Sequence, residues 1–249
     1  MTTVTTTATA ATTTFTAAST VTVLTTAQRV STLTADLIVP LQQGYLADRS
    51  SAVSTLARLR RGAGKEFSQV PDLWGLTDTG LLHDWPAGGW VPGEEELIRA
   101  EDAVHVALTL WALHQQSRGT GMHRSDSRAS PHGLGSAVRR LMPPGDIDQP
   151  VRKRFVRAGT APDLPALAQR LRDIVVLLRG SDIPLDYALL AEQLYRWQEP
   201  GGRDAVRRAW GRSFHSYRPP QDPKAGDKGA AADSNDSTEL ADLTDKDAS

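Results

Sequence analysis

The sequence predicts an all-α protein, a compact helical bundle over residues 27–218, and three observations support this fold class. Apolar side chains recur at spacings of three and four residues across that range, which is the period of a helix with one buried face. Glycine, proline and short polar residues interrupt the pattern where helices are expected to begin and end. No run in the range alternates convincingly between apolar and polar residues, as a half-buried strand would.

The two ends of the chain differ from this central range in composition. Residues 1–26 contain 14 threonines and few large apolar side chains, so we expect them to be disordered. Residues 219–249 carry 3 lysines against 8 acidic residues, and we expect a disordered acidic tail there. Residues 27–218 carry 25 Lys and Arg against 21 Asp and Glu, so the helical range is mildly basic.

Two helices are expected in the first part of the range. The first begins near Ala27 and is expected to kink at Pro40, because proline removes a helical hydrogen bond. The second is expected to be capped by Asp48, to bury Val53 and Leu56, and to end at the glycines that follow residue 61.

The longest helix is expected to start at Glu94, because an acidic first turn complements the helix dipole. Short helices are expected to open at Pro71 and over residues 133–141 and 151–158. Two amphipathic helices are expected to follow, one after Pro162 and one opening at Pro184. A last helix follows residue 202. It should bury Val206, Trp210 and Phe214 and expose Arg203, Arg207, Arg208 and Arg212.

Composition and motifs exclude several classes of function. The chain has no cysteine, so disulfides and cysteine-based zinc sites are excluded. It has no apolar run of about 20 residues to span a membrane and no secretory signal pattern, so we expect a cytoplasmic protein. The paired glycines at 119–121 and 133–135 lack the rest of a nucleotide-binding loop. No catalytic motif is present either, so we expect neither a cofactor nor an enzyme.

One metal-binding alternative stays open. The His83-Asp84 dipeptide is of the kind that helical phosphohydrolases use for metal, and Glu101, Asp102 and His105 lie within about one turn of the long helix. A metal-dependent hydrolase would need these side chains to converge. The pattern disfavours this, because the buried stripe of the helix runs beside Asp102 and His105 rather than through them.

Basic side chains recur in three places, over residues 58–65, 118–157 and 203–212. In each place they lie next to glycines or helix ends, where backbone N–H groups also reach phosphates. His123 would add a flat ring beside Arg124. Aromatic residues are few and fall mostly on apolar stripes, so backbone contact is favoured over base stacking. The alternative is that each cluster pairs with carboxylates of the same chain.

Ten short stretches follow one another in a distinctive order and spacing. They are Leu59-Arg-Arg-Gly62, Pro71-x-Leu-Trp74, Thr109-Leu-Trp-Ala-Leu-His-Gln115, Met122-His123, Leu134-Gly-Ser-Ala137, Arg154-Phe155, Leu164 through Leu178, Asp186-Tyr187, Leu194-Tyr195-x-Trp-Gln198 and Trp210-Gly-Arg-x-Phe214. Together they resemble the small subunit (CasB family) of the type I-E CRISPR Cascade surveillance complex. The resemblance covers roughly residues 27–217, and it rests on the order and spacing of the motifs rather than on any one of them.

The resemblance implies a non-catalytic all-α subunit that helps to stabilise an R-loop in antiviral defence. Its implied partners are the crRNA, the target and displaced DNA strands, the backbone and large subunits, and a second copy of itself. It assigns nucleic-acid contact to two groups of residues. The first basic surface comprises Arg58, Arg60, Arg61 and Lys65; the second basic surface comprises Arg124, Arg139, Arg140, Arg152 and Arg154.

A second hypothesis is a protein–protein adaptor without direct nucleic-acid contact. In that case the basic surfaces would meet acidic surfaces of partner subunits, so the residues alone do not separate the two functions.

Overall fold

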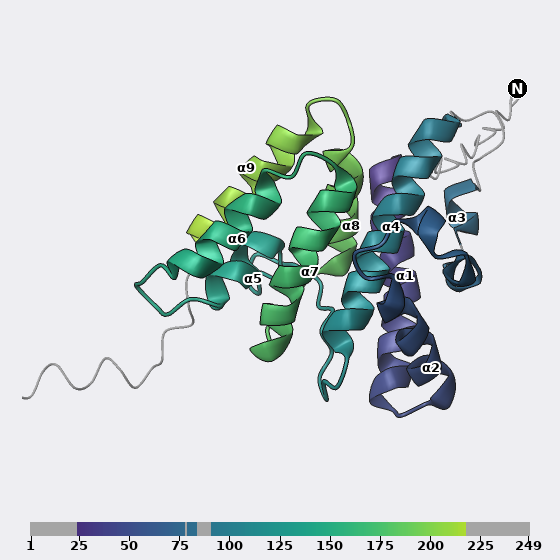
Figure 1. The fold of residues 1–249 in the computed structure, drawn as a ribbon, viewed down its shortest axis with the longest axis horizontal. Helices are drawn as coiled ribbons and strands as arrows, with labels where there is room; N and C mark the ends of the chain where they lie inside the picture. The colour runs from purple at the N-terminus through teal and green to yellow at the C-terminus, as the bar shows by residue number, and fades with distance from the viewer. Residues whose placement is uncertain (1–23, 78, 84–90, 218–249) are drawn as a thin grey trace, which may run out of the picture.

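The computed structural model describes residues 24–77, 79–83 and 91–217, and every regular element in these ranges is a helix (Figure 1). The predicted all-α fold class is therefore confirmed. The α-helices are α1 (Thr26–Leu46), α2 (Ser50–Leu59), α3 (Gly80–His83), α4 (Glu94–Gln115), α5 (Leu134–Arg140), α6 (Gln149–Gly159), α7 (Leu164–Gly180), α8 (Tyr187–Trp197) and α9 (Gly202–Ser216). The 3₁₀-helices are η1 (Arg60–Gly62), η2 (Phe67–Gln69) and η3 (Pro71–Leu76).

The segments predicted to be disordered, 1–26 and 219–249, lie outside the described residues except for Leu24, Thr25 and Thr26. Thr25 and Gln28 form a capping box, in which each side chain bonds the other residue's backbone N–H group. The first helix thus begins at Thr26, one residue before the predicted boundary, and it continues past Pro40 to Leu46.

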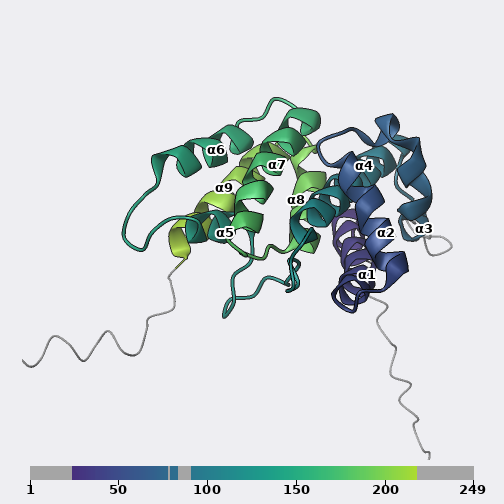
Figure 2. The ribbon, with the colours of Figure 1, turned by 60° about the horizontal axis from the view of Figure 1, so that its bottom comes forward.

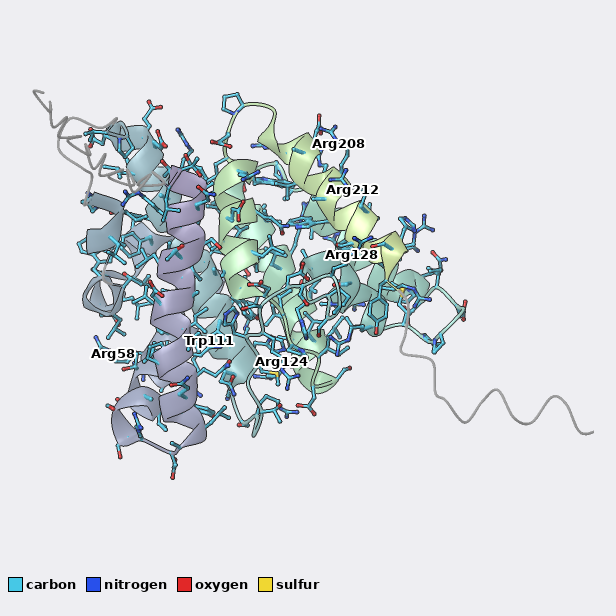
Figure 3. All side chains as sticks on the ribbon, turned by 180° about the vertical axis from the view of Figure 1, so that it is seen from behind. Arg58, Trp111, Arg124, Arg128, Arg208 and Arg212 are labelled. Carbon is cyan, nitrogen blue, oxygen red and sulfur yellow. The ribbon has the colours of Figure 1, made fainter. Side chains whose placement is uncertain are left out.

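Helix α4 is the centre of the molecule. It contacts α1, α7 and α8, and α8 also packs along α1 (Figure 1). Every residue from Ala103 to Gln115 is buried, so the second half of α4 is enclosed on all sides rather than along the single predicted stripe. Trp111 lies within this enclosure and donates from Nε1 to Gln42 Oε1 of α1 at 3.3 Å (Figure 3).

The C-terminal half packs as a second group of helices, with α5 against α9 and α6 against α7 (Figure 2). Stacked aromatic rings join them. Trp197 of α8 and Trp210 of α9 lie 5.6 Å apart between ring centroids, and Phe155 of α6 lies 5.4 Å from Phe214 of α9. The predicted inner face of α9 is confirmed, because Val206, Trp210 and Phe214 are buried.

Two predicted helix starts are wrong. Asp48 adopts a left-handed backbone (φ 52°) in the turn before α2 and caps nothing, and Val53 is exposed because α2 buries Ala52 instead. The penultimate helix does not open at Pro184. Asp186 caps it two residues later and accepts the Leu189 N–H at 2.9 Å.

No helix in the described ranges combines the length and the apolar character that crossing a membrane requires.

Candidate nucleic-acid interface

The first basic surface lies where α2 ends against α4. Leu59 and Gly62 are buried there, and a Cβ atom on Gly62 would come within 2.7 Å of Leu73 and 2.9 Å of Thr109. Only glycine therefore lets η1 pack this closely on α4. Since the turn holds its backbone inward, Arg60 and Arg61 are left on the outside and are exposed.

The four cations of this surface differ in their local partners. Arg58 donates to the backbone oxygen of Asp72 at 2.8 Å, which holds its guanidinium beside η3. Within the described residues, the side chains of Arg60, Arg61 and Lys65 make no hydrogen bond or ion pair. They stand near the C-terminus of α2, where the negative end of the helix dipole favours positive charge.

The second basic surface is divided among three elements. Arg139 and Arg140 end α5, and with Ser181, Ile183 and Tyr217 they line an open hollow of about 340 Å³. Arg139 donates to the backbone oxygen of Pro143 at 3.1 Å, which leaves its guanidinium half-buried at the edge of the hollow.

Helix α6 carries the next two residues of the second basic surface, Arg152 and Arg154, and both are exposed. Asp148 caps the helix by accepting the Val151 N–H at 2.9 Å. Because Phe155 faces inward against α9, the charged positions around it point to solvent.

Arg124 lies in the loop between α4 and α5 and is exposed (Figure 3). Its backbone N–H donates to Leu185 O at 3.3 Å. The loop is held by two carboxylates: Asp186 Oδ2 accepts the Asp126 N–H at 2.6 Å, and Asp126 Oδ1 accepts the His132 N–H at 2.5 Å.

The sequence suggested that the His123 ring lies on the surface beside Arg124, and this prediction is wrong. It is 5% exposed, and its Nδ1 accepts the backbone N–H of Tyr187 at 3.1 Å. Burial lowers the pKa of His123 although Asp186 lies 3.9 Å away. The ring thus fixes the loop to α8 as a neutral group and is not available to a ligand.

The alternative in which each basic cluster pairs with carboxylates of its own chain included Glu94 to Glu96, Glu101 and the acidic tail; the tail lies outside the described residues, and the pairing is not seen for the predicted sites within them. None of the nine residues of the two basic surfaces forms an ion pair within the described parts of the chain, whereas Arg99, Arg118, Arg196 and Arg207 do. The third basic run on α9 is exposed as predicted (Figure 3). Arg207 there is engaged by Asp204 at 3.0 Å and lies over the Trp197 ring.

The residues of the metal-binding alternative do not converge where the structure describes them. His83 Nε2 lies 3.2 Å from Glu101 Oε1, but His105 is turned to the backbone oxygen of Lys65 at 3.2 Å. Asp84 lies outside the described residues. Among the residues that are described, no three His, Asp or Glu side chains are grouped as metal ligands would be.

A cavity of about 410 Å³ was not predicted from the sequence. Residues of the segment 65–74, of α4 and of the start of α7 line the cavity. Its walls carry Glu101, Asp102 and His105, the side chains that the sequence offered as metal ligands. The aromatic residues Phe67 and Trp74 complete the walls, and nothing in their spacing indicated a cavity.

Comparisons with known proteins identify the family. The family described as CRISPR-associated protein Cse2 matches residues 55–215. The crystal structure of CasB from Thermobifida fusca is similar, with 50% sequence identity over 76% of this chain and 98% of that chain and a TM-score of 0.66.

Two more distant structures share the fold. A Cse2-family protein from Thermus thermophilus has 21% identity over 77% of this chain and 98% of its own (TM-score 0.51). A chain of a CRISPR RNA-guided surveillance complex has 16% identity over 75% and 93% (TM-score 0.52). No curated protein sequence matches the chain significantly. The resemblance seen in the sequence motifs is confirmed: the chain belongs to the Cse2 (CasB) family of CRISPR-associated proteins.

Proposed function

We propose that this protein is the non-catalytic small subunit of a type I-E Cascade complex, and that its basic surfaces bind the backbones of the crRNA and the target DNA. By doing so it stabilises the R-loop in antiviral defence. Its membership of the Cse2 family supports the assignment to a complex, as does its fold, which a chain of an RNA-guided surveillance complex shares. Base pairing reads the sequence in such complexes, while protein cations neutralise phosphates.

The observation that carries the nucleic-acid part of this proposal is the state of the nine predicted side chains. They are exposed or half-exposed, and within the described residues none is neutralised by a carboxylate. Unpaired surface cations favour a polyanion, because binding releases its condensed counterions. Of the four tryptophans that the structure describes, Trp111, Trp197 and Trp210 are buried and Trp74 is 53% exposed. Few rings are thus free to stack on bases, which supports contact with the backbone.

The test is a charge reversal at the first basic surface, Arg60→Glu with Arg61→Glu, in the reconstituted complex. We expect R-loop lifetime to fall while the subunit still co-purifies with its partners and its unfolding midpoint stays nearly unchanged, since both side chains are exposed. The matched control is Arg49→Glu with Arg172→Glu. It changes the net charge equally at exposed positions outside both surfaces, and wild-type R-loop lifetime is expected.

Two outcomes would contradict the proposal. If the doubly reversed variant no longer enters the complex, the surface binds a protein partner and the adaptor function is the correct one. If the complex assembles and the R-loop persists as long as in the wild type, the first basic surface has no part in binding nucleic acid. Sedimentation of the isolated chain and of the complex will show whether two copies associate.

A further inference from the structure

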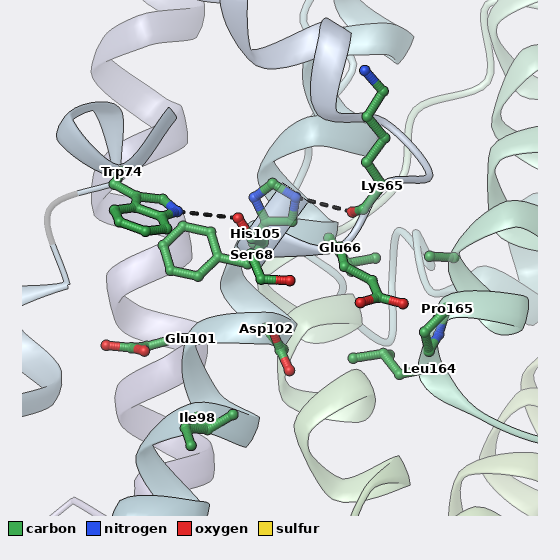
Figure 4. A pocket seen from close by; sticks show the side chains of 13 residues that line it. Lys65, Glu66, Ser68, Trp74, Ile98, Glu101, Asp102, His105, Leu164 and Pro165 are labelled. Atoms are coloured by element: carbon green, nitrogen blue, oxygen red, sulfur yellow. Dashed lines mark hydrogen bonds between the residues drawn. The ribbon is translucent and has the colours of Figure 1, made fainter. Parts of the chain in front are cut away.

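The 410 Å³ cavity is lined by acidic and aromatic side chains, which the binding of phosphates does not require. It opens between the segment 65–74, the first half of α4 and the start of α7 (Figure 4). One wall is aromatic: the Phe67 ring lies 5.3 Å from His105 and 5.9 Å from Trp74 between ring centroids. Trp74 donates from Nε1 to Phe67 O at 3.0 Å, so the indole is held in place although the residue is 53% exposed.

The other wall is acidic. Glu66, Glu101 and Asp102 line the cavity together, and the Asp102 carboxylate has no hydrogen bond or ion pair within the described residues. Burial raises the pKa of Asp102 to about 6, and the neighbouring carboxylates of Glu101 and Glu66 add to the shift. An ionised Asp102 is therefore partly desolvated and beside like charges.

Within the described residues, no basic group forms an ion pair with Asp102. The Lys65 side chain extends away from the acidic wall in Figure 4. Burial lowers the pKa of His105, which keeps its ring neutral, and Nε2 donates to the backbone oxygen of Lys65. His83 lies beside Glu101 at 3.2 Å but does not line the cavity. The start of α7 contributes only apolar side chains, Leu164, Pro165 and Ala168.

We propose that this cavity is a socket for an arginine side chain of a partner protein. A nucleic acid would bring phosphates against the acidic wall, and a neutral apolar ligand would bury the carboxylates without a partner. A guanidinium suits both walls, because it is planar, weakly hydrated and able to stack on an aromatic face while donating to carboxylates.

The rim of the cavity supports a protein as the source of the arginine. Trp74 and Ile98 are 53% and 50% exposed, and both line it. Exposed tryptophan beside apolar surface is typical of the anchors of protein interfaces, where arginine and tryptophan are enriched. Lys65 belongs both to the first basic surface and to the lining of the cavity. The inference still does not depend on nucleic-acid binding, because it uses the carboxylates and the aromatic rings of the cavity.

The first test is a titration of the isolated chain with acetyl-leucyl-arginyl-leucine amide, followed by the NMR resonance of the Trp74 indole N–H group. The same peptide with citrulline in place of arginine has nearly the same shape without the charge. We expect saturable binding of the arginine peptide, at least about tenfold tighter than that of the citrulline peptide. Equal binding of both peptides, or no binding of either, would overturn the proposal.

The second test uses Asp102→Asn, with Glu94→Gln as the control. Glu94 is exposed at the start of the same helix and outside the cavity. Asp102→Asn should weaken arginine-peptide binding about tenfold, and the control should leave it unchanged. In the wild type, binding should also weaken as the pH falls through about 6, because Asp102 gains a proton, and Asp102→Asn should lose that dependence. Full affinity in this variant would count against the socket.

The third test identifies the occupant in the assembled complex. A photoreactive benzophenone amino acid at position 98, on the exposed rim, should cross-link to an arginine-containing peptide of another kind of subunit. A cross-link to a second copy of this chain, or to RNA or DNA, would overturn the assignment. This arm rests on the proposed membership of a complex, whereas the peptide titration does not, so the two proposals can fail separately.

Discussion

Three of the buried histidines have a lowered pKa, and we expect them to make the stability of this fold depend on pH. His105, His114 and His123 are 1%, 0% and 5% exposed. Burial lowers the pKa of each, that of His114 to about 3. His114 Nδ1 lies 2.8 Å from the Tyr187 hydroxyl, which joins the last turn of α4 to the start of α8. In the unfolded chain the same rings take up protons near pH 6.5.

We therefore expect the free energy of unfolding to fall as the pH is lowered from 7 to 5. In that window the unfolded state binds more protons than the folded state, and each histidine contributes a slope of up to about 1.4 kcal/mol per pH unit. Asp102 acts in the opposite direction below its pKa of about 6, but it is one group against three. Urea denaturation at both pH values measures the effect.

The variant His114→Gln separates this cause from general acid effects. It should be less stable than the wild type at pH 7, because the contact with Tyr187 is lost, and it should show a shallower fall towards pH 5. Equal pH slopes in variant and wild type would rule out His114 as a source of the dependence.

At the scale of elements, α5 and α9 approach each other through Gly135. A Cβ atom there would collide with the backbone oxygen of Trp210 and come within 2.6 Å of the Phe214 nitrogen. Gly135→Ala should force the two helices apart and lower the free energy of unfolding by about 2 kcal/mol or more. Chemical denaturation is the measurement.

The control for this prediction is Gly211→Ala, which also lies in α9 but has nothing within 4 Å of the added methyl group. It should be neutral or stabilising by about 0.5–1 kcal/mol, because alanine favours the helix. A similar effect of both substitutions would show that helix propensity, and not the close approach of α5 and α9, governs Gly135.

A helix could be predicted from the sequence where it buries only one face, because its apolar residues then recur with the helical period. The pattern around Val206, Trp210 and Phe214 predicted α9 correctly because a surface helix shows its period directly. Helix α4 is enclosed on all sides by elements far along the chain, so no single stripe could describe it. Asp48 failed as a cap because capping depends on backbone angles, and its φ of 52° is set by the turn.

In the candidate site, too, local sequence patterns predict some residues correctly, whereas contacts between distant parts of the chain determine others. The exposure of Arg60, Arg61 and Arg152 followed from local pattern alone. The burial of His123 did not, because it results from the bridge between its backbone and Leu185, some sixty positions later. The cavity beside Asp102 could not be predicted for the same reason, since three segments separated in the sequence form its walls.

At the scale of the whole molecule, the basic residues lie on two separate groups of helices. Arg58 lies on the half formed by α1 to α4, while the exposed arginines of α6 and α9 lie on the other half (Figures 1 and 3). An extended polyanion could contact both halves at once, whereas a compact ligand could not.

If both halves contact one nucleic acid, charge reversals in them should act independently. Arg60→Glu with Arg61→Glu, and Arg152→Glu with Arg154→Glu, should each weaken binding of single-stranded DNA, and the combined variant should show the sum within about 0.5 kcal/mol. Each lost phosphate contact should reduce the slope of log K against log salt by about 0.7. Fluorescence anisotropy over a series of KCl concentrations measures both. An effect confined to one pair would place the ligand on one half.

The packing of α8 along α1 has a consequence for how the chain is made. The apolar face of α1 is completed by a helix near the other end of the sequence. During synthesis on the ribosome, the side of α1 that faces α8 stays in water until residues 187–197 of the 249-residue chain have emerged. A nascent chain halted before α8 would therefore be a target for chaperones and proteases, however well its first helices form.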